Sequence, residues 1–136
     1  LKDYLSPLIN RPKKQIEKHH IFPKNYLKTC LKLKTVDFNQ IANMIYIDYH
    51  VNIRISDMPP HEYWNIVLEE CSENTRDFVS KNYTEAYDLP YEFWNMEYFE
   101  FLDARRKLMA ESIRRYFEKL FWIYRRIRKQ IFFNKF

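Results

Sequence analysis

Glu17-Lys18-His19-His20-Ile21-Phe22-Pro23-Lys24 is the stretch that decides how the first half of the chain is interpreted. Residues 15–22 alternate in polarity, which predicts a β-strand that ends near the two histidines. Neighbouring strand residues point to opposite faces, and a proline favours a turn. The chain should therefore turn directly after His20, where two adjacent histidines can serve two different roles.

A second strand and then a helix are expected further along the chain. Residues 41–48 are rich in β-branched and aromatic side chains, which favour a strand. Asp48 can cap a helix that continues through Ser56. Pro59-Pro60 then ends that helix and starts the next one. With a further helix at residues 25–33, this order predicts an α+β fold.

The composition limits the classes of protein that the chain can belong to. Its 136 residues suit one domain, and its two cysteines make neither a disulfide framework nor a four-ligand zinc site. No apolar run approaches the roughly 20 residues of a membrane span, so no membrane partner is expected. With no signal peptide, a reduced cytoplasmic location is the default.

The chain contains no glycine, so left-handed backbone positions must fall on other residues. Asparagine and aspartate tolerate that conformation best. The candidates are Asn10, Asn25, Asn74 and Asp88.

Charge is strongly segregated along the sequence. Residues 1–36 have a balance of +7, residues 37–103 of −11 and residues 104–136 of +9, although the net charge is only +5. Two basic ends around an acidic middle indicate an anionic partner for the ends.

Residues 95–133 contain no helix breaker and should form one long amphipathic helix. At about 1.5 Å per residue it would span roughly 55 Å, more than a domain of this size. Its end must therefore project, break or pair with another chain. The apolar residues that recur at steps of three, four or seven are Leu102, Met109, Ile113, Phe117, Leu120, Tyr124, Ile127 and Ile131.

The histidines and two later asparagines suggest a hydrolytic site. Histidine titrates near neutral pH, so it suits the general base that deprotonates water in phosphodiester hydrolysis. That reaction also needs a cation, and an ion held by only two side chains keeps positions open for water and substrate. Asn43 and Asn52 flank the expected second strand and can complete such a site.

These segments resemble the HNH (ββα-metal) nucleases, and more narrowly the nuclease part of GmrSD-type restriction and phage-defence proteins. The resemblance covers roughly residues 15–120. It implies a bacterial, cytoplasmic protein, of which this chain is a C-terminal fragment behind a nucleotide-hydrolysing domain. The segments that carry it are His19-His20-Ile21-Phe22-Pro23-Lys24-Asn25-Tyr26-Leu27, Asn39-Gln40-Ile41-Ala42-Asn43, residues 52–63 and, more weakly, residues 98–108.

The resemblance implies a role for each matched residue. His20 is the expected general base, His19 and Asn52 the expected ligands of one divalent ion, and Asn43 the residue that tethers the loop and orients the base. The ion is expected to be Mg²⁺, with Mn²⁺, Ni²⁺ or Zn²⁺ as alternatives. The implied reaction is cleavage of DNA that leaves 5′-phosphate and 3′-hydroxyl ends. The long interval from His20 to Asn43 departs from the pattern, as does the lack of an acidic residue directly before the base.

Each role has a plainer alternative. The histidines can be an ordinary surface pair, Asn43 can satisfy buried backbone groups, and Asn52 can face solvent. Asp48 and His50 are competing ligand candidates, although His50 should face elsewhere on the helix. Glu17 is either a solvated strand residue or a support for the ligands.

The expected architecture is thus a single domain, mostly helical. It has a ββα-metal core at about residues 15–72 and a helical extension at about residues 73–136. The rival function is a catalytically silent nucleic-acid-binding or assembly module on the same fold. The long helix is expected to contact the DNA backbone; a solvated face, a membrane-surface helix and a self-association arm are the alternatives. The predicted DNA contacts are Arg105, Arg106, Arg114, Arg115, Arg125, Arg126, Arg128 and Lys129.

Overall fold

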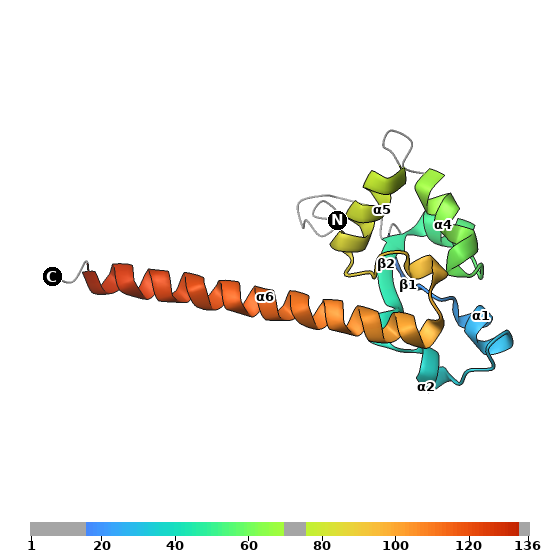
Figure 1. Cartoon of the computed structure of the whole chain (residues 1–136), viewed down its shortest axis with the longest axis horizontal. Coiled ribbons are helices and arrows are strands. Elements are labelled where there is room, and N and C mark those ends of the chain that lie inside the picture. The colour runs from blue at the N-terminus through green and yellow to red at the C-terminus, as the bar shows by residue number, and fades with distance from the viewer. Residues whose placement is uncertain (1–15, 70–75, 134–136) are drawn as a thin grey trace.

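The computed structural model describes residues 16–69 and 76–133. The fold is α+β and mostly helical, with a two-stranded antiparallel sheet, which confirms the predicted class (Figure 1). Its elements in chain order are β1 (Ile16–His20), α1 (Lys24–Thr29), α2 (Thr35–Phe38), η1 (Ile41–Asn43), β2 (Met44–Asp48), α3 (Tyr49–Ile55), α4 (Pro60–Glu69), α5 (Arg76–Ala86), η2 (Phe93–Asn95) and α6 (Tyr98–Phe133).

The sheet aligns the end of β1 with the start of β2. His19 lies opposite Ile45, and His20 lies opposite Met44. β1 ends at the histidines as predicted, whereas β2 is shorter than predicted, because the first residues of that segment form the 3-10 turn η1. This turn presents the carbonyl of Asn43 to the amide of Ile21 at 2.9 Å, which closes the end of the sheet. α3 follows β2 directly, so two strands and a helix come together.

One hydrophobic core joins the sheet, the short helices and the start of α6. The ring of Phe22 packs on Tyr98 and Phe101 with centroid distances of 5.4 and 4.9 Å. The ring of Trp64 stacks on Trp94 at 4.8 Å. Residues from before and after position 73 therefore share one core, and this sets the position of α6 against the sheet.

Arg105 fixes the root of α6, which we define as residues 98–112. Its guanidinium donates to the carbonyls of Ala42 and Met44, both at 2.9 Å, and to that of Tyr87 at 3.3 Å. Burial lowers the pKa of Arg105 to about 10, although Asp88 partly opposes this. Arg105 is therefore a structural residue and not the predicted DNA contact, because its side chain is buried and its two terminal nitrogens donate to carbonyls of the core.

Most of the left-handed backbone conformations fall on residues that the sequence did not single out. Asp88 was predicted correctly, whereas Asn25 lies within α1, and Asn10 and Asn74 lie outside the described residues. Each left-handed residue other than glycine costs roughly 1–2 kcal/mol, which tertiary packing must offset. The described residues with positive φ are Lys32, Ser56, Asp88 and Glu92.

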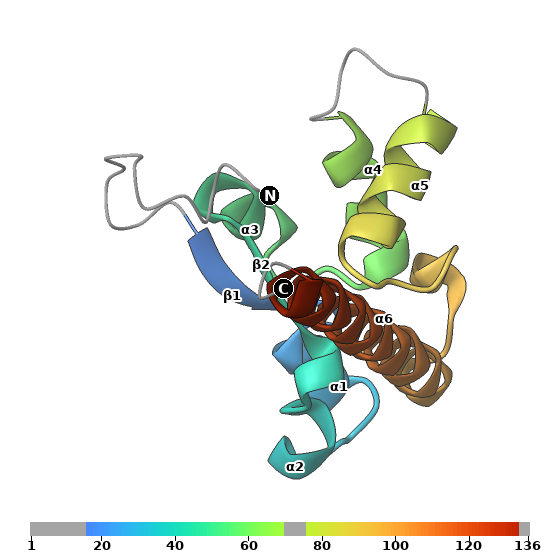
Figure 2. The same cartoon turned by 90° about the vertical axis from the view of Figure 1, so that its left-hand side faces the viewer.

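Beyond its root, α6 leaves the globular part and projects as a single rod (Figures 1 and 2). Its 36 residues span about 54 Å. Every side chain from Ile113 to Arg128 is exposed. Residues 113–133 are called the arm below. The helix therefore projects and does not break, and pairing with another chain stays a prediction. In the described ranges, no helix is long and apolar enough to cross a membrane.

Candidate active site

The two histidines at the end of β1 lie in different environments. His19 is buried, and its ring meets the ring of Tyr63 edge-on at a centroid distance of 6.0 Å. His20 is half-buried and meets the ring of Phe38 edge-on at 6.4 Å. Strand alternation thus separates the two imidazoles and permits two roles.

A chain of hydrogen bonds joins β1 to α3 through His19. Nδ1 of His19 lies 2.8 Å from Oδ1 of Asn52. Nδ2 of Asn52 donates to Oε2 of Glu17 at 2.7 Å. Because a carboxylate only accepts, Asn52 turns its NH₂ group to Glu17 and its oxygen to His19. Glu17 thus supports the predicted ligand pair and is not merely a solvated strand residue.

This chain of hydrogen bonds also sets the protonation of His19. Oδ1 of Asn52 accepts from Nδ1–H, so Nε2 is left as a bare acceptor; that atom is buried without a hydrogen-bond partner among the described residues. Burial lowers the pKa of His19 to about 4, the bond to Asn52 opposes this, and His20 lowers the pKa further. His19 is therefore neutral at pH 7, the form that can bind a metal.

The pair of His19 and Asn52 fits one divalent ion. Ligands about 2.1 Å from an ion at right angles lie roughly 3 Å apart, and the two donor atoms lie 2.8 Å apart. An ion would take the place of the Nδ1 proton, while Glu17 would keep the amide of Asn52 in its present orientation. Among residues 16–69 and 76–133, no group of three or more His, Cys, Asp or Glu side chains is close enough to hold an ion.

Asn43 tethers the turn after His20. Its side chain is fully buried. Its Oδ1 accepts from the amide of Phe22 at 2.9 Å, and its Nδ2 donates to the carbonyls of Phe22 and Phe38 at 3.1 and 3.2 Å. These bonds match the predicted tethering role and also the plainer role of satisfying buried backbone groups. Asn43 is a positioning residue, because it acts on His20 through the backbone of the turn.

His20 is uncharged at neutral pH, but one of its nitrogens is covered. Burial lowers the pKa of His20, a side-chain hydrogen bond with Asn39 opposes this, and the cations of Lys18 and Lys24 lower it further. Its Nε2 is shielded and has no hydrogen-bond partner in the described part of the chain. Deprotonation of water at Nε2 therefore requires the ring to turn outward.

Asn52 is the residue of α3 whose hydrogen bond with His19 the structure records. His50 is exposed, with its ring edge-on to Tyr49 at 5.5 Å. The side chain of Asp48 lies outside the described residues. His61 stands exposed near the start of α4, 3.7 Å from a carboxylate oxygen of Glu62.

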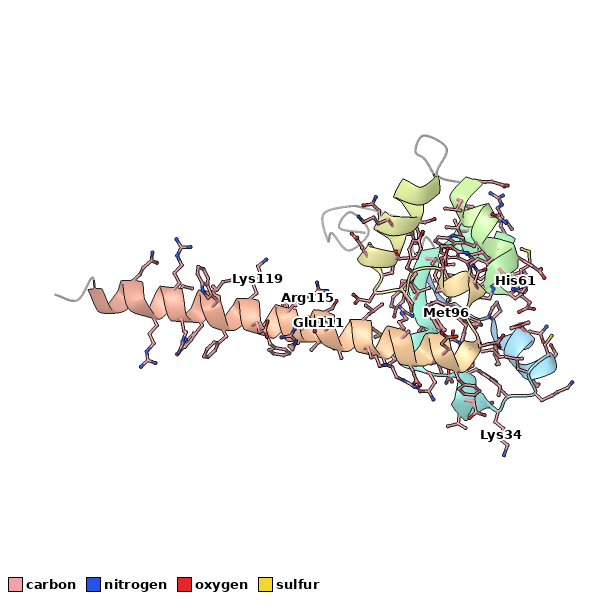
Figure 3. All side chains as sticks on the ribbon, in the orientation of Figure 1. Lys34, His61, Met96, Glu111, Arg115 and Lys119 are labelled. Atoms are coloured by element: carbon pink, nitrogen blue, oxygen red, sulfur yellow. The ribbon has the colours of Figure 1, made fainter. Side chains whose placement is uncertain are left out.

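The predicted DNA contacts on α6 fall into groups. Arg106 lies 2.9 Å from Asp103, and Arg114 lies 2.6 Å from both Glu111 and Glu118. Arg115 approaches Glu111 only to 4.0 Å. Exposed ion pairs of this kind leave the cations open to solvent and available to phosphate. Figure 3 shows Arg115 and Lys119 on the projecting part of α6, beyond Glu111.

The arm carries the outermost cations. Arg125 lies over the ring of Phe121 at 5.0 Å, and Arg126 over that of Trp122 at 5.7 Å. Arg128 is exposed as well. The side chain of Lys129 lies outside the described residues.

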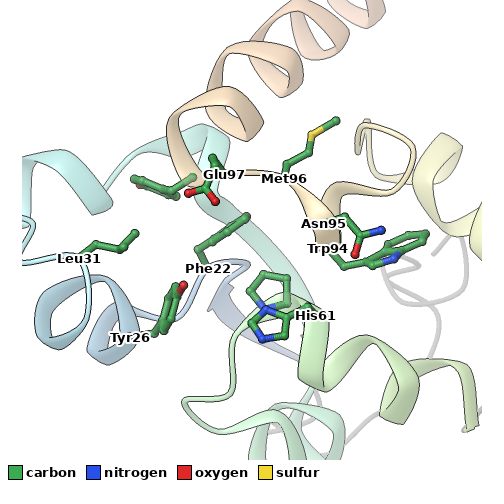
Figure 4. A pocket seen from close by; sticks show the side chains of 10 residues that line it. Phe22, Tyr26, Leu31, His61, Trp94, Asn95, Met96 and Glu97 are labelled. Atoms are coloured by element: carbon green, nitrogen blue, oxygen red, sulfur yellow. The ribbon is translucent and has the colours of Figure 1, made fainter.

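A separate hollow of about 270 Å³ lies between α1, the start of α4 and the segment that leads into α6 (Figure 4). Phe22, Tyr26, His61, Trp94 and Glu97 are among the side chains that line it. Its lining contains none of the predicted catalytic or metal-binding residues, so it is distinct from the site at His19.

The sequence analysis did not predict the structural roles of two residues near the site. Tyr63 donates its hydroxyl to the carbonyl of Ile21 at 2.8 Å and so supports the turn after the histidines. No pattern marked it. Arg105 did leave a signal, because it stands three residues after Leu102 and four before Met109, on the apolar face of α6.

No family model, curated protein or solved structure matches the chain. The likeness to HNH nucleases therefore rests on the residues quoted above and on their arrangement.

Proposed function

We propose that the chain is a metal-dependent endonuclease that hydrolyses DNA phosphodiester bonds. The observation that supports this most is the contact between His19 and Asn52, which joins a strand end to a helix at 2.8 Å. The half-buried His20 stands on the next residue of the same strand, on the opposite face. Two histidines in separate roles, with an asparagine beside one of them, suit hydrolysis of a phosphodiester.

The residues would divide the reaction between them. His19 and Asn52 hold the divalent ion, which when bound supplies positive charge to stabilise the phosphorane and the leaving 3′ oxygen. His20, being neutral, accepts a proton from the attacking water once a ring nitrogen faces it. Asn43 keeps the turn after His20 rigid through both polar groups of Phe22.

A plasmid-nicking assay with Mg²⁺ or Mn²⁺ tests this proposal. His20→Ala should lower the cleavage rate about 10²–10⁴-fold, which is the usual contribution of a general base. His61→Ala is the matched control, because it removes an exposed histidine on α4 that lines the separate hollow, and it should keep the wild-type rate. Activity of His20→Ala within threefold of wild type would reject the assignment of the base.

The rival is a catalytically silent nucleic-acid-binding or assembly module. Two observations favour it: Nε2 of His20 is covered, and Nδ1 of His19 is already bonded to Asn52. Calorimetric titration with Mn²⁺ separates the two functions. Wild type that binds no ion and cuts no DNA, yet still binds duplex, would establish the silent module.

The exposed cations of α6 would hold the DNA backbone without reading sequence. This set omits Arg105, which lies in the core. The defence context, the bacterial cytoplasm and an upstream nucleotide-hydrolysing domain stay predictions of the resemblance. The reading frame around the coding sequence tests the last of these directly.

A further inference from the structure

The arm exposes an apolar stripe with no counterpart in the described part of the chain. Its members are 41–60% exposed, although each is a large aliphatic or aromatic residue. The core of the globular part buries residues of the same types almost completely, although single ones such as Ile41 and Tyr46 are exposed on its surface. We call them the stripe: Ile113, Tyr116, Leu120, Ile123 and Ile127.

The spacing of the stripe is that of a coiled-coil seam. Its steps are three, four, three and four residues, an average of 3.5, and Met109 extends the series by another step of four. Sustained spacing of this kind places every member on the side that faces a partner helix. Charged side chains occupy the opposite face, and Trp122 lies among them.

The globular part blocks the same face of α6 at its root. Leu102 and Met109 continue the stripe backwards, and the core buries the first of them almost completely and the second in part. A partner helix can therefore lie on the stripe only from about Ile113 outward. A partner running parallel would bring its own globular part to the place that the first one already occupies. An antiparallel partner avoids this clash.

We propose that the arm pairs with the arm of a second copy of this chain in an antiparallel coiled coil. The proposal does not depend on nuclease activity. The charged face of each arm stays outward in this pairing.

Charge also favours the antiparallel direction. It brings the basic end of each arm beside the other copy's globular part, and residues 37–103 there carry a balance of −11. A groove with Ile41, Tyr46 and Met109 in its lining lies where the stripe reaches the globular part. The end of the second copy's arm would bind in this groove.

The exposed area matches what a stable dimer needs. The stripe and the adjacent Phe117 and Tyr124 offer seven residues that are 41–63% exposed. Each would lose roughly 100 Å² when covered, about three-fifths of what a large side chain can bury. Both arms together would bury on the order of 1,400 Å², within the usual range of about 1,600 ± 400 Å² for specific interfaces.

A membrane surface is the main other occupant for a basic amphipathic helix. That role needs no 3.5-residue spacing, and it would favour a tryptophan on the apolar side. Trp122 lies on the charged side instead. The second copy is therefore the better occupant.

Sedimentation equilibrium of the full chain tests the pairing. Wild type should form a dimer at micromolar concentration. Leu120→Glu, at the centre of the stripe, should weaken dimerisation at least 100-fold, about 2.7 kcal/mol, because each copy would place a charge in the seam. Trp122→Glu is the matched control, because it adds the same charge on the other face. Its dimer affinity should stay within about threefold, with circular dichroism confirming that both variants fold.

Cysteine cross-linking tests the direction in a Cys30→Ser, Cys71→Ser background. Antiparallel arms place Ile127 near Tyr116 of the other copy, so Ile127→Cys alone should not form a disulfide-linked dimer. An equal mixture of Tyr116→Cys chains and Ile127→Cys chains should form one.

Three results would overturn the proposal. The first is a wild type that stays monomeric at 100 micromolar, whether or not it sediments with anionic phospholipid vesicles. The second is a dimer that Leu120→Glu leaves intact. The third is self-linked Ile127→Cys, which would show that the arms run parallel.

Discussion

The root and the arm of α6 are two stretches of one helix with opposite surroundings. In the root, Phe101, Leu102 and Arg105 are almost fully buried. In the arm, every side chain from Ile113 to Arg128 is exposed. Both halves carry an apolar face at helical spacing. The pattern therefore predicts that a face will be covered, but it does not say whether its partner lies in the same chain.

Two arginines give the sharpest test of this contrast. Arg105→Met should lower the free energy of unfolding by about 4 kcal/mol, because three carbonyls in the core lose a charged donor. The matched Arg125→Met, in the arm, should change it by less than about 0.5 kcal/mol. Urea titration measures both. Equal effects would mean that the root is no better packed than the arm.

The histidine at the sheet end makes the globular part sensitive to acid. The pKa of His19 lies at about 4 in the folded chain and near 6.5 when unfolded. The contribution of His19 to the free energy of unfolding is therefore fully present above pH 6.5. It falls by roughly 3 kcal/mol as pH decreases toward 4. His19→Gln should flatten the urea-unfolding profile over that window in the presence of chelator. His61→Gln, on an exposed histidine, should leave the slope as it is.

The arm should contribute strongly to DNA affinity and little to the stability of the fold. Changing Arg125, Arg126, Arg128 and Lys129 to Glu should weaken binding by one to two orders of magnitude for duplexes of any sequence. It should reduce the slope of log affinity against log salt by about 0.9 for each lost phosphate contact. Fluorescence anisotropy over a salt series measures both. An unchanged slope would remove the arm from the DNA footprint.

The smallest expected effect belongs to a tryptophan of the arm, and a tryptophan of the core provides the contrast. Trp122→Ala, in the arm, should change the free energy of unfolding by less than about 0.5 kcal/mol. Trp64→Ala should cost about 3–5 kcal/mol, because that ring stacks on Trp94 inside the core. Thermal unfolding of both variants compares the two losses in the free energy of unfolding. A large loss of unfolding free energy in Trp122→Ala would show that another part of the chain packs on the arm.

Sequence patterns predicted the elements that have strong periodicity. α6 was predicted to within a few residues because no breaker interrupts its spacing over ten turns. α2 and η2 were missed, because elements of four and three residues leave no periodic signal. The closeness of His19 and Asn52 came from the resemblance alone, since nothing in the spacing of a strand and a helix fixes their distance.

Arg105 was misinterpreted for a related reason. A charged residue was grouped with its charged neighbours, although its helical position is on the apolar face. Sequence separation also hides its partners, because Ala42 and Met44 lie about 60 positions earlier. Burial of a cation depends on carbonyls that only the fold brings together.

The three bonds of Arg105 also act as a rotational lock. They fix the direction in which the stripe of the arm points, because α6 runs without a break from Arg105 to Ile127. One alanine inserted after Ser112, the last residue of the root, would turn the stripe by about 100° and leave the contacts of the root unchanged. Seven inserted residues would nearly restore the direction and lengthen the arm by about 10 Å. The position of a buried side chain thus sets the direction that the stripe faces some 30 Å away. This helix should therefore tolerate insertions less well than substitutions.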